Sequence, residues 1–330
     1  MTEGAGRESF RPVPGDPVCW PDSFGSRFLV TVDVEEEFDW TAPLDRAQRS
    51  TQAMAAFPDA HRRFAAAGVP LTCLADYPIA TDPRSIDILR AVHGDGRSAI
   101  GAQLHAWVNP PHEEIVSPRT SFSGNLPRRL QAAKITALTE AITRAFGHPL
   151  AFRAGRYGLG PDTTALLVDA GYRLDSSVRA GYDYTAQGGP NYSRVGSDAW
   201  RMAGLIELPL TTVYTGSARA GGAGLYSLLG HLPKGRGLFA RAGLLSRIAL
   251  TPEDMPLAAA SEAVRVAAGE GLRLLTFSFH SPSLAPGHTP YVRDAADLRA
   301  FWRWWNEMLI LLDRLGIRPA SLVEVLAAAG

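Results

Sequence analysis

The chain has 330 residues, of which 46% are hydrophobic, so it can bury a large core as one α/β domain or as two smaller ones. Its 33 basic and 33 acidic residues balance, and no long basic block stands out. This balance gives no reason to expect nucleic acid or an anionic membrane as a partner. A neutral or small polar substrate fits the composition better.

The cysteines and the N-terminus bear on the cellular compartment. Cys19 and Cys73 are too few for a disulfide framework, and we expect both to be reduced packing residues. Residues 1–27 are polar and rich in glycine and proline, and no apolar run reaches the length of a signal peptide or a transmembrane helix. We therefore expect a cytoplasmic protein with an extended segment over 1–27 and one domain over 28–330.

Apolar runs alternate with helical periods along the chain. Strands are expected at 28–32, 69–75, 98–104, 149–153, 172–175, 205–212 and 273–279. Helices are expected at 51–67 with a kink or restart at Pro58, at 83–93, from an N-cap at Asn125 to Gly147, and at 162–171, 253–269 and 294–315. A glycine-rich insertion over 216–237 shows no clear period. This alternation predicts an α/β fold with a parallel sheet covered by its crossovers.

The first expected strand ends in a cluster of acids. If the strand continues through Glu35, its two-residue period puts Asp33, Glu35 and Glu37 on one face. Crowded carboxylates repel one another, so a fold that gathers them usually supplies a metal, an arginine or a shared proton. The alternative is a solvated acidic loop, which is the usual interpretation of such a run.

Five polar residues each lie at or just past the C-terminal end of an expected strand: Asp33, His105, Arg153, Asp175 and His280. In a parallel barrel these ends share one face, which is where such barrels place their active sites. Each residue also has a structural interpretation, as a hydrogen-bonded histidine or a member of a buried ion pair. Their like positions favour a common site.

Short motifs surround these five residues. They are Thr31-Val-Asp-Val-Glu35, His105-Ala-Trp-Val-Asn109, Phe152-Arg-Ala-Gly-Arg-Tyr157, Asp175-Ser-Ser-Val178 and Leu275-Thr-Phe-Ser-Phe-His280. In this order they resemble the five motifs of the NodB-homology polysaccharide deacetylases, carbohydrate esterase family four. The resemblance extends from about Phe28 to the last expected helix, and it implies a distorted (β/α)7-type barrel.

The resemblance also implies catalytic roles. Asp33 matches the catalytic base, and Arg153 would orient it. His280 matches the general acid, which Asp175 would hold in its charged form. The backbone N–H of Tyr157 would help to stabilise the tetrahedral oxyanion.

A divalent metal is implied as well, with Glu35, His105 and Asn109 as its ligands. Zn²⁺ is the expected ion, and Mn²⁺, Co²⁺ and Ni²⁺ are alternatives. The chain departs from the family pattern twice, because Val34 replaces the second acid of the first motif and Asn109 replaces the second histidine. His112 is a substitute ligand to consider.

Four residues near the motifs are expected to bind substrate: Trp40, Trp107, Arg156 and Tyr192. The aromatic rings could stack on sugar faces, with core packing as the alternative.

The resemblance implies a metal-dependent hydrolase that removes an N-acetyl or related acyl group from an amino sugar or a sugar-containing molecule. One alternative is a hydrolase of a small non-sugar amide or ureide, because the same fold serves such substrates. The other is a glycan-binding pseudoenzyme, which the replacements at Val34 and Asn109 make plausible.

Overall fold

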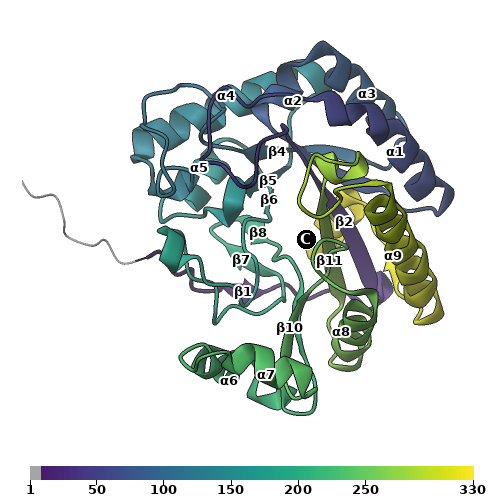
Figure 1. The fold of residues 1–330 in the computed structure, drawn as a ribbon. Helices are drawn as coiled ribbons and strands as arrows, with labels where there is room; N and C mark the ends of the chain where they lie inside the picture. The colour runs from purple at the N-terminus through teal and green to yellow at the C-terminus, as the bar shows by residue number, and fades with distance from the viewer. Residues whose placement is uncertain (1–8) are drawn as a thin grey trace, which may run out of the picture.

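A computed structural model describes residues 9–330, so the beginning of the expected N-terminal segment lies outside the described residues. In that part of the chain, seven parallel strands form a curled sheet, an open barrel (Figure 1). In spatial order they are β8 (Leu205–Glu207), β6 (Leu174–Asp175), β5 (Ala151–Ala154), β4 (Ala99–Leu104), β3 (Leu71–Ala75), β2 (Arg27–Val34) and β11 (Leu274–His280). The predicted fold class, a distorted (β/α) barrel, is confirmed.

One residue links the two ends of this sheet. Thr211, four positions past the end of β8, donates its backbone N–H to the carbonyl of Thr276 in β11 at 3.3 Å. Its hydroxyl accepts the N–H of Thr276 at 2.8 Å. The gap between β8 and β11 is therefore bridged by a loop, and the two strands do not pair.

Five further strands extend or decorate the barrel: β1 (Asp16–Pro17), β7 (Trp200–Met202), β9 (Thr212–Thr215), β10 (Ser246–Ala249) and β12 (Arg318–Pro319). β7 pairs antiparallel with β8, and β1 pairs antiparallel with β7, so residues of the N-terminal segment extend the edge of the sheet. β12 pairs with the start of β2, and β9 and β10 form a separate antiparallel ribbon. Cys73 is buried in the core as expected, whereas Cys19 is exposed.

The chain has ten α-helices within the described residues, and most of them cover the outer face of the barrel. They are α1 (Phe57–Ala66), α2 (Tyr77–Thr81), α3 (Pro83–His93), α4 (Arg128–Phe146), α5 (Thr163–Asp169), α6 (Gly222–Leu229), α7 (Gly235–Arg241), α8 (Leu257–Gly269), α9 (Ala295–Arg314) and α10 (Leu322–Ala329). In Figure 1, α1 to α5 lie along the upper side, α8 and α9 flank β11, and α6 and α7 stand apart below. Within the described residues, no helix combines the length and apolar character needed to cross a membrane.

Some helix boundaries differ from the prediction for local reasons. The helix expected at 51–67 restarts near Pro58, which is one of the two expected outcomes. A 3-10 segment over Gln52–Ala56 precedes α1, and Pro58 lies in the first turn of α1, where its missing N–H costs nothing. The N-cap position of α4 is Pro127, and the amide of Asn125 instead donates to the carbonyls of Arg119 and Gly188. The predicted N-cap at Asn125 is therefore wrong.

Two segments hold more structure than the sequence pattern indicated. The glycine-rich insertion contains α6 and α7, whose periodicity the glycines obscure. The helix at 295–314 is not the last one, because α10 follows it. Its start is marked by a capping box, in which Ser321 and Glu324 bond each other's backbone N–H.

Side chains along the parallel strands alternate between the interior of the barrel and the helices. On β2, Val30, Val32 and Val34 pack outward into the main core. Leu29 points the other way, into a smaller cluster that α10 closes at the N-terminal end of the strands. By the two-residue period, Asp33 must also point inward, above Leu29 and at the opposite end of the barrel.

Candidate active site

A cavity of about 720 Å³ lies at the C-terminal ends of the parallel strands. The polar side chains that line it include Asp33, Glu35, Gln103, His105, Arg153 and His280. Asp33, Arg153 and His280 have the same parity on their strands as interior residues such as Leu29, Ala151 and Leu274. The alternation of parallel strands therefore brings these side chains together.

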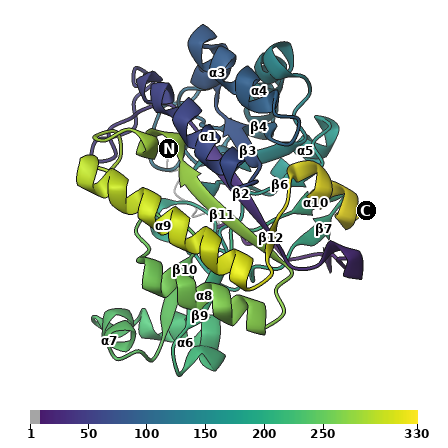
Figure 2. The same cartoon turned by 90° about the vertical axis from the view of Figure 1, so that its right-hand side faces the viewer.

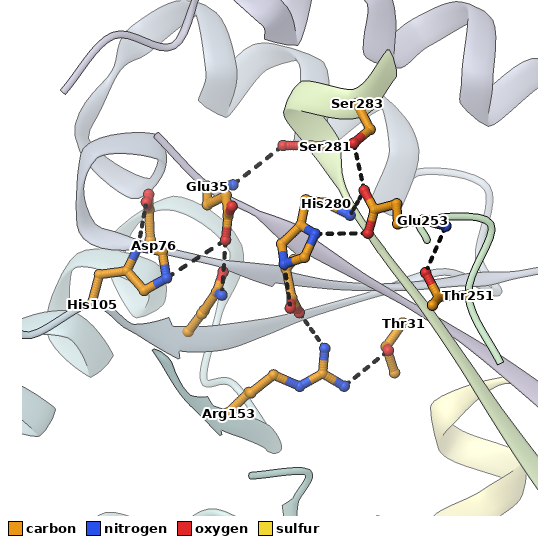
Figure 3. Close-up of polar contacts among 12 residues, drawn as sticks. Thr31, Glu35, Asp76, His105, Arg153, Thr251, Glu253, His280, Ser281 and Ser283 are labelled. Atoms are coloured by element: carbon orange, nitrogen blue, oxygen red, sulfur yellow. Dashed lines mark hydrogen bonds and ion pairs between the residues drawn. The ribbon is translucent and has the colours of Figure 1, made fainter. Parts of the chain in front are cut away.

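Asp33 is held by Arg153, whose side chain is buried. The guanidinium pairs with Oδ1 of Asp33. It also donates to the hydroxyl of Thr31 at 2.9 Å (Figure 3). Two more bonds, to the carbonyl of Ser176 at 3.0 Å and to its hydroxyl at 3.1 Å, fix the arginine from the other side. With one oxygen held in this way, Asp33 presents its other oxygen to the cavity.

His280 faces Asp33 across the cavity, with its Nε2 3.8 Å from Oδ2 of Asp33. Its Nδ1 lies 2.8 Å from Oε2 of Glu253, and its backbone N–H donates to Oε1 of Glu253 at 3.1 Å (Figure 3). Burial opposes the charged imidazolium, but the carboxylates of Glu253, Glu35 and Asp33 outweigh it and raise the pKa of His280 to about 10. The ring is therefore charged at neutral pH.

Asp175, the partner predicted for His280, lies elsewhere. Its neighbour Leu174 occupies the interior cluster, so Asp175 points to the outside of the barrel. There it accepts a bond from the hydroxyl of Ser177 and lies opposite Glu207 of β8. Burial raises the pKa of Asp175 to about 6 and that of Glu207 well above its usual range. The carboxylate that holds His280 is Glu253.

His105 stands between two carboxylates. Its Nδ1 lies 2.8 Å from Oε2 of Glu36, and its Nε2 faces Oε2 of Glu35 at 3.5 Å. The backbone N–H of Glu36 in turn donates to Asp76 at 2.8 Å. Burial raises the pKa of Glu36 to about 8 and that of Asp76 well above its usual range, so we infer that these two acids share a proton. Glu36 therefore orients the ring of His105 and leaves Nε2 free for the cavity.

The floor of the cavity fits a divalent metal. Oε1 of Glu35 and Oε1 of Gln103 are buried without a hydrogen-bond partner, and the amide nitrogen of Gln103 lies 3.1 Å from Glu35. Burial raises the pKa of Glu35 to about 7, and the nearby His280 and His105 offset only part of this effect. One carboxylate, one imidazole nitrogen and one amide oxygen suit Zn²⁺ or Mn²⁺.

Two groups of three residues bring their oxygen and nitrogen atoms within 4.8 Å of one another. One is Asp33, Glu35 and His280 in the cavity, where Nδ1 of His280 is already held by Glu253. The other is Glu36, Asp76 and His105. Neither acid of this group lines the cavity. A metal there would be out of reach of a substrate, so we assign these two acids to the support of His105.

The structure does not bring Asn109 into the cavity. Its buried amide donates to the carbonyls of Pro110 at 2.7 Å and Lys134 at 2.9 Å, and it does not line the cavity. His112, the substitute considered from the sequence, does not line it either. The expectation that Asn109 or His112 lies in the cavity is therefore wrong. The side-chain amide that contacts Glu35 belongs to Gln103.

Three of the four residues expected to bind substrate line the cavity: Trp40, Trp107 and Arg156. The fourth, Tyr192, is buried, and its hydroxyl donates to the carbonyl of Tyr157 at 2.5 Å. Arg156 and Tyr157 have φ values of 56° and 58°, a left-handed conformation that costs about 1–3 kcal/mol per residue and often marks functional sites. Tyr192 therefore supports this turn instead of meeting the substrate.

Glu253, Glu36, Asp76 and Gln103 were missed by sequence reasoning. Asp76 directly follows β3, and Gln103 lies two residues before His105, so the rule applied to the other strand ends would have found both. Glu253 gave no such signal. It precedes α8 in a loop, and only the tertiary structure places it against His280.

The comparisons with known proteins bear on the fold. No protein-family model and no curated protein sequence matches the chain. A candidate polysaccharide deacetylase from Mycobacterium smegmatis aligns with 96% of this chain and 94% of its own, with a TM-score of 0.52 and 18% identity. The chain has the fold of the polysaccharide deacetylases. A candidate glycoside hydrolase/deacetylase from Parabacteroides distasonis aligns with 90% of this chain and 69% of its own, with a TM-score of 0.54 and 12% identity.

Proposed function

We propose that this protein is a metal-dependent hydrolase that removes an N-acetyl or related acyl group from an amino sugar or a sugar-containing molecule. The observation that supports this most strongly is the facing pair of Asp33 and His280, 3.8 Å apart in one cavity. Arg153 holds the first and Glu253 holds the second. Amide hydrolysis needs such a division, with one group to take a proton and another to give one.

Asp33 is the proposed base. Arg153 fixes its carboxylate, so Oδ2 can take a proton from a water molecule that attacks the acyl carbon. His280 is the proposed acid, because Glu253 occupies Nδ1 and leaves the proton on Nε2 facing the cavity. This proton would go to the departing nitrogen. The backbone N–H of Tyr157, in the strained turn at the cavity wall, is the proposed donor to the oxyanion.

Glu35, His105 and Gln103 are the residues that would hold the metal. When bound, the ion supplies Lewis acidity toward the acyl carbonyl and the attacking water. Glu36 would keep the imidazole of His105 in the tautomer that offers Nε2. Zn²⁺ remains the expected ion, with Mn²⁺, Co²⁺ and Ni²⁺ as alternatives, since an amide oxygen is a weak zinc ligand.

The size and lining of the cavity favour a sugar. Its volume of about 720 Å³ far exceeds the space around one small amide, and Trp40, Tyr157, Tyr184 and Tyr291 line it. Aromatic rings at the edge of a polar floor suit stacking against the apolar faces of a pyranose.

Acetate release tests this proposal. The purified protein, reconstituted with Zn²⁺ or Mn²⁺, is incubated with N-acetylglucosamine, with its short oligomers, and with a small ureide and a simple acetamide. We expect metal-dependent acetate release from the sugars that chelation by EDTA abolishes and that returned metal restores. Acetate or ammonia release from the small amides alone would mean that the substrate is a small amide and not a sugar. Glycan binding without hydrolysis of any of these compounds would mean that the protein is a pseudoenzyme.

The Glu253→Gln variant tests the assignment of the acid through pH. Because the pKa of His280 is raised to about 10, the rate should hold below that pH and fall as the pH rises through it. Without the charge of Glu253, burial lowers the pKa of His280, so the alkaline limb of kcat/KM should move to lower pH. The comparison is Asp175→Asn, measured over the same range. If the alkaline limb moves in Asp175→Asn and stays in place in Glu253→Gln, the carboxylate that holds His280 is Asp175 and not Glu253.

A further inference from the structure

The segment over 208–252 carries a net positive charge. It contains five basic residues, Arg219, Lys234, Arg236, Arg241 and Arg247, and no acidic residue. The balanced charge of the whole chain, which gave no reason to expect an anionic membrane as a partner, hides this local excess. Figures 1 and 2 show where the segment lies: the ribbon of β9 and β10 carries α6 and α7 away from the barrel. We call residues 216–243 the α6–α7 hairpin.

Large apolar side chains are exposed on this hairpin. Leu228, Leu232 and Leu238 are 62%, 55% and 65% exposed, and they lie within eleven residues of sequence. Comparably exposed residues elsewhere in the described chain, such as Ile115 and Val323, stand singly. Scattered apolar residues are normal on a surface, whereas a group of them on a projecting element marks an interaction surface.

Two cations lie close to these leucines in the sequence. Across the described residues, Lys234 and Arg241 form no salt bridge, although Arg219 lies 3.5 Å from Glu270. We propose that the α6–α7 hairpin docks the protein on an anionic phospholipid membrane, with the leucines among the acyl chains and Lys234 and Arg241 at the headgroup phosphates. Leucines flanked by lysine and arginine are typical of peripheral membrane helices, whereas the core of a protein–protein interface is depleted in lysine.

The hairpin is fixed to the wall of the cavity by a ladder of stacked arginines and tyrosines. Arg236 lies 4.5 Å from the ring of Tyr226, and Arg247 lies 4.8 Å from that ring and 3.5 Å from the ring of Tyr182. The ring of Tyr182 is also contacted by Arg179, at 4.1 Å, and Arg179 lines the cavity. Cation–π contacts of this kind stabilise an otherwise glycine-rich element. The ladder therefore links the docking hairpin to a residue of the cavity wall, whether or not the cavity hydrolyses an amide.

Vesicle sedimentation with the full chain tests the docking. The probes are vesicles of phosphatidylcholine alone and vesicles of about three parts phosphatidylcholine to one part phosphatidylglycerol. We expect binding to the anionic vesicles only. That binding should weaken strongly in about 0.5 M NaCl, where the range of electrostatic attraction is about 4 Å.

Two hairpin variants and one control locate the contact. The variant with Leu228, Leu232 and Leu238 all changed to serine should lose about tenfold or more of its vesicle affinity, because it loses the apolar insertion. Lys234→Gln with Arg241→Gln should lose the preference for phosphatidylglycerol. Ile310→Ser with Val323→Ser removes exposed apolar side chains from α9 and α10 and should bind like the original chain. Circular dichroism and thermal unfolding check that each variant is folded.

Three outcomes would overturn the docking proposal. The first is that the original chain binds neither kind of vesicle. The second is that the folded hairpin variants bind as well as the control does. The third is a dimer in sedimentation velocity that the serine variant dissociates, without vesicle binding, which would assign the leucines to a contact between two copies of the chain.

Discussion

Replacing His280 by alanine is expected to lower kcat by about 10²- to 10⁴-fold, with little loss of bound metal. The reason is geometric, since Nε2 of His280 faces Asp33 while Nδ1 is held by Glu253. The side chain is thus placed to protonate the leaving nitrogen, a task that water performs poorly. The alkaline limb of the pH profile should disappear with it. The measurement is kcat against pH on the acetylated substrate, beside metal content for the same preparation.

His288→Ala is the matched control, because this histidine contacts Glu37 at 3.1 Å and does not line the cavity. It should keep most of the activity. Loss of metal from His280→Ala would make His280 a ligand, and full activity in that variant would remove it from the reaction.

The second large effect is expected from His105→Ala, which should lose its metal and its activity. His105 supplies the imidazole nitrogen of the proposed site. Mutating even a residue that only hydrogen-bonds to a metal ligand typically lowers metal affinity by about 10- to 100-fold. Losing the ligand itself should cost at least about 100-fold in metal affinity. Metal content by elemental analysis and competition with a chelating dye measure this directly, without reference to turnover.

Gln103→Ala and Asn109→Ala separate the two amides that could be ligands. The first should weaken metal binding, because Oε1 of Gln103 is buried without a partner while its amide nitrogen donates to Glu35. The second should keep the metal once folded, because Asn109 bonds the backbone of Lys134. The reverse pattern would mean that Asn109 is the ligand, as the family pattern first indicated.

The parallel strands and their inward residues could be predicted from sequence because they follow a local rule. The strand expected at 273–279 is found at 274–280, and the helix expected at 83–93 is found with those limits. Asp33, Arg153 and His280 enter the cavity because side chains alternate and parallel strands end on one face. Nothing beyond the strand positions and their parity was needed.

The same rule fails where a strand is short or ends early. β6 has only two residues, and a change of one position sends Asp175 to the outside of the barrel. β2 ends at Val34, so the alternation of the acidic run stops there. Glu36 then meets His105, while Glu37 turns toward His288.

Glu253 and the docking hairpin depend on long-range contacts that no period encodes. Glu253 precedes a helix, where acids are common, and only the packing of its loop against β11 brings it to His280. The two helices of the hairpin are interrupted by glycines, so their pattern is weak even though both form.

Locating the metal tests the proposed site most directly. Anomalous diffraction from crystals grown with Zn²⁺ or Mn²⁺ should show one peak at the floor of the cavity. We predict a carboxylate oxygen of Glu35 and Nε2 of His105 within about 2.0–2.3 Å of the peak, with Oε1 of Gln103 as the next protein ligand. A peak on the Nδ1 side of His105, between Glu36 and Asp76, or no peak at saturating metal, would contradict the proposed site and the reaction that depends on it.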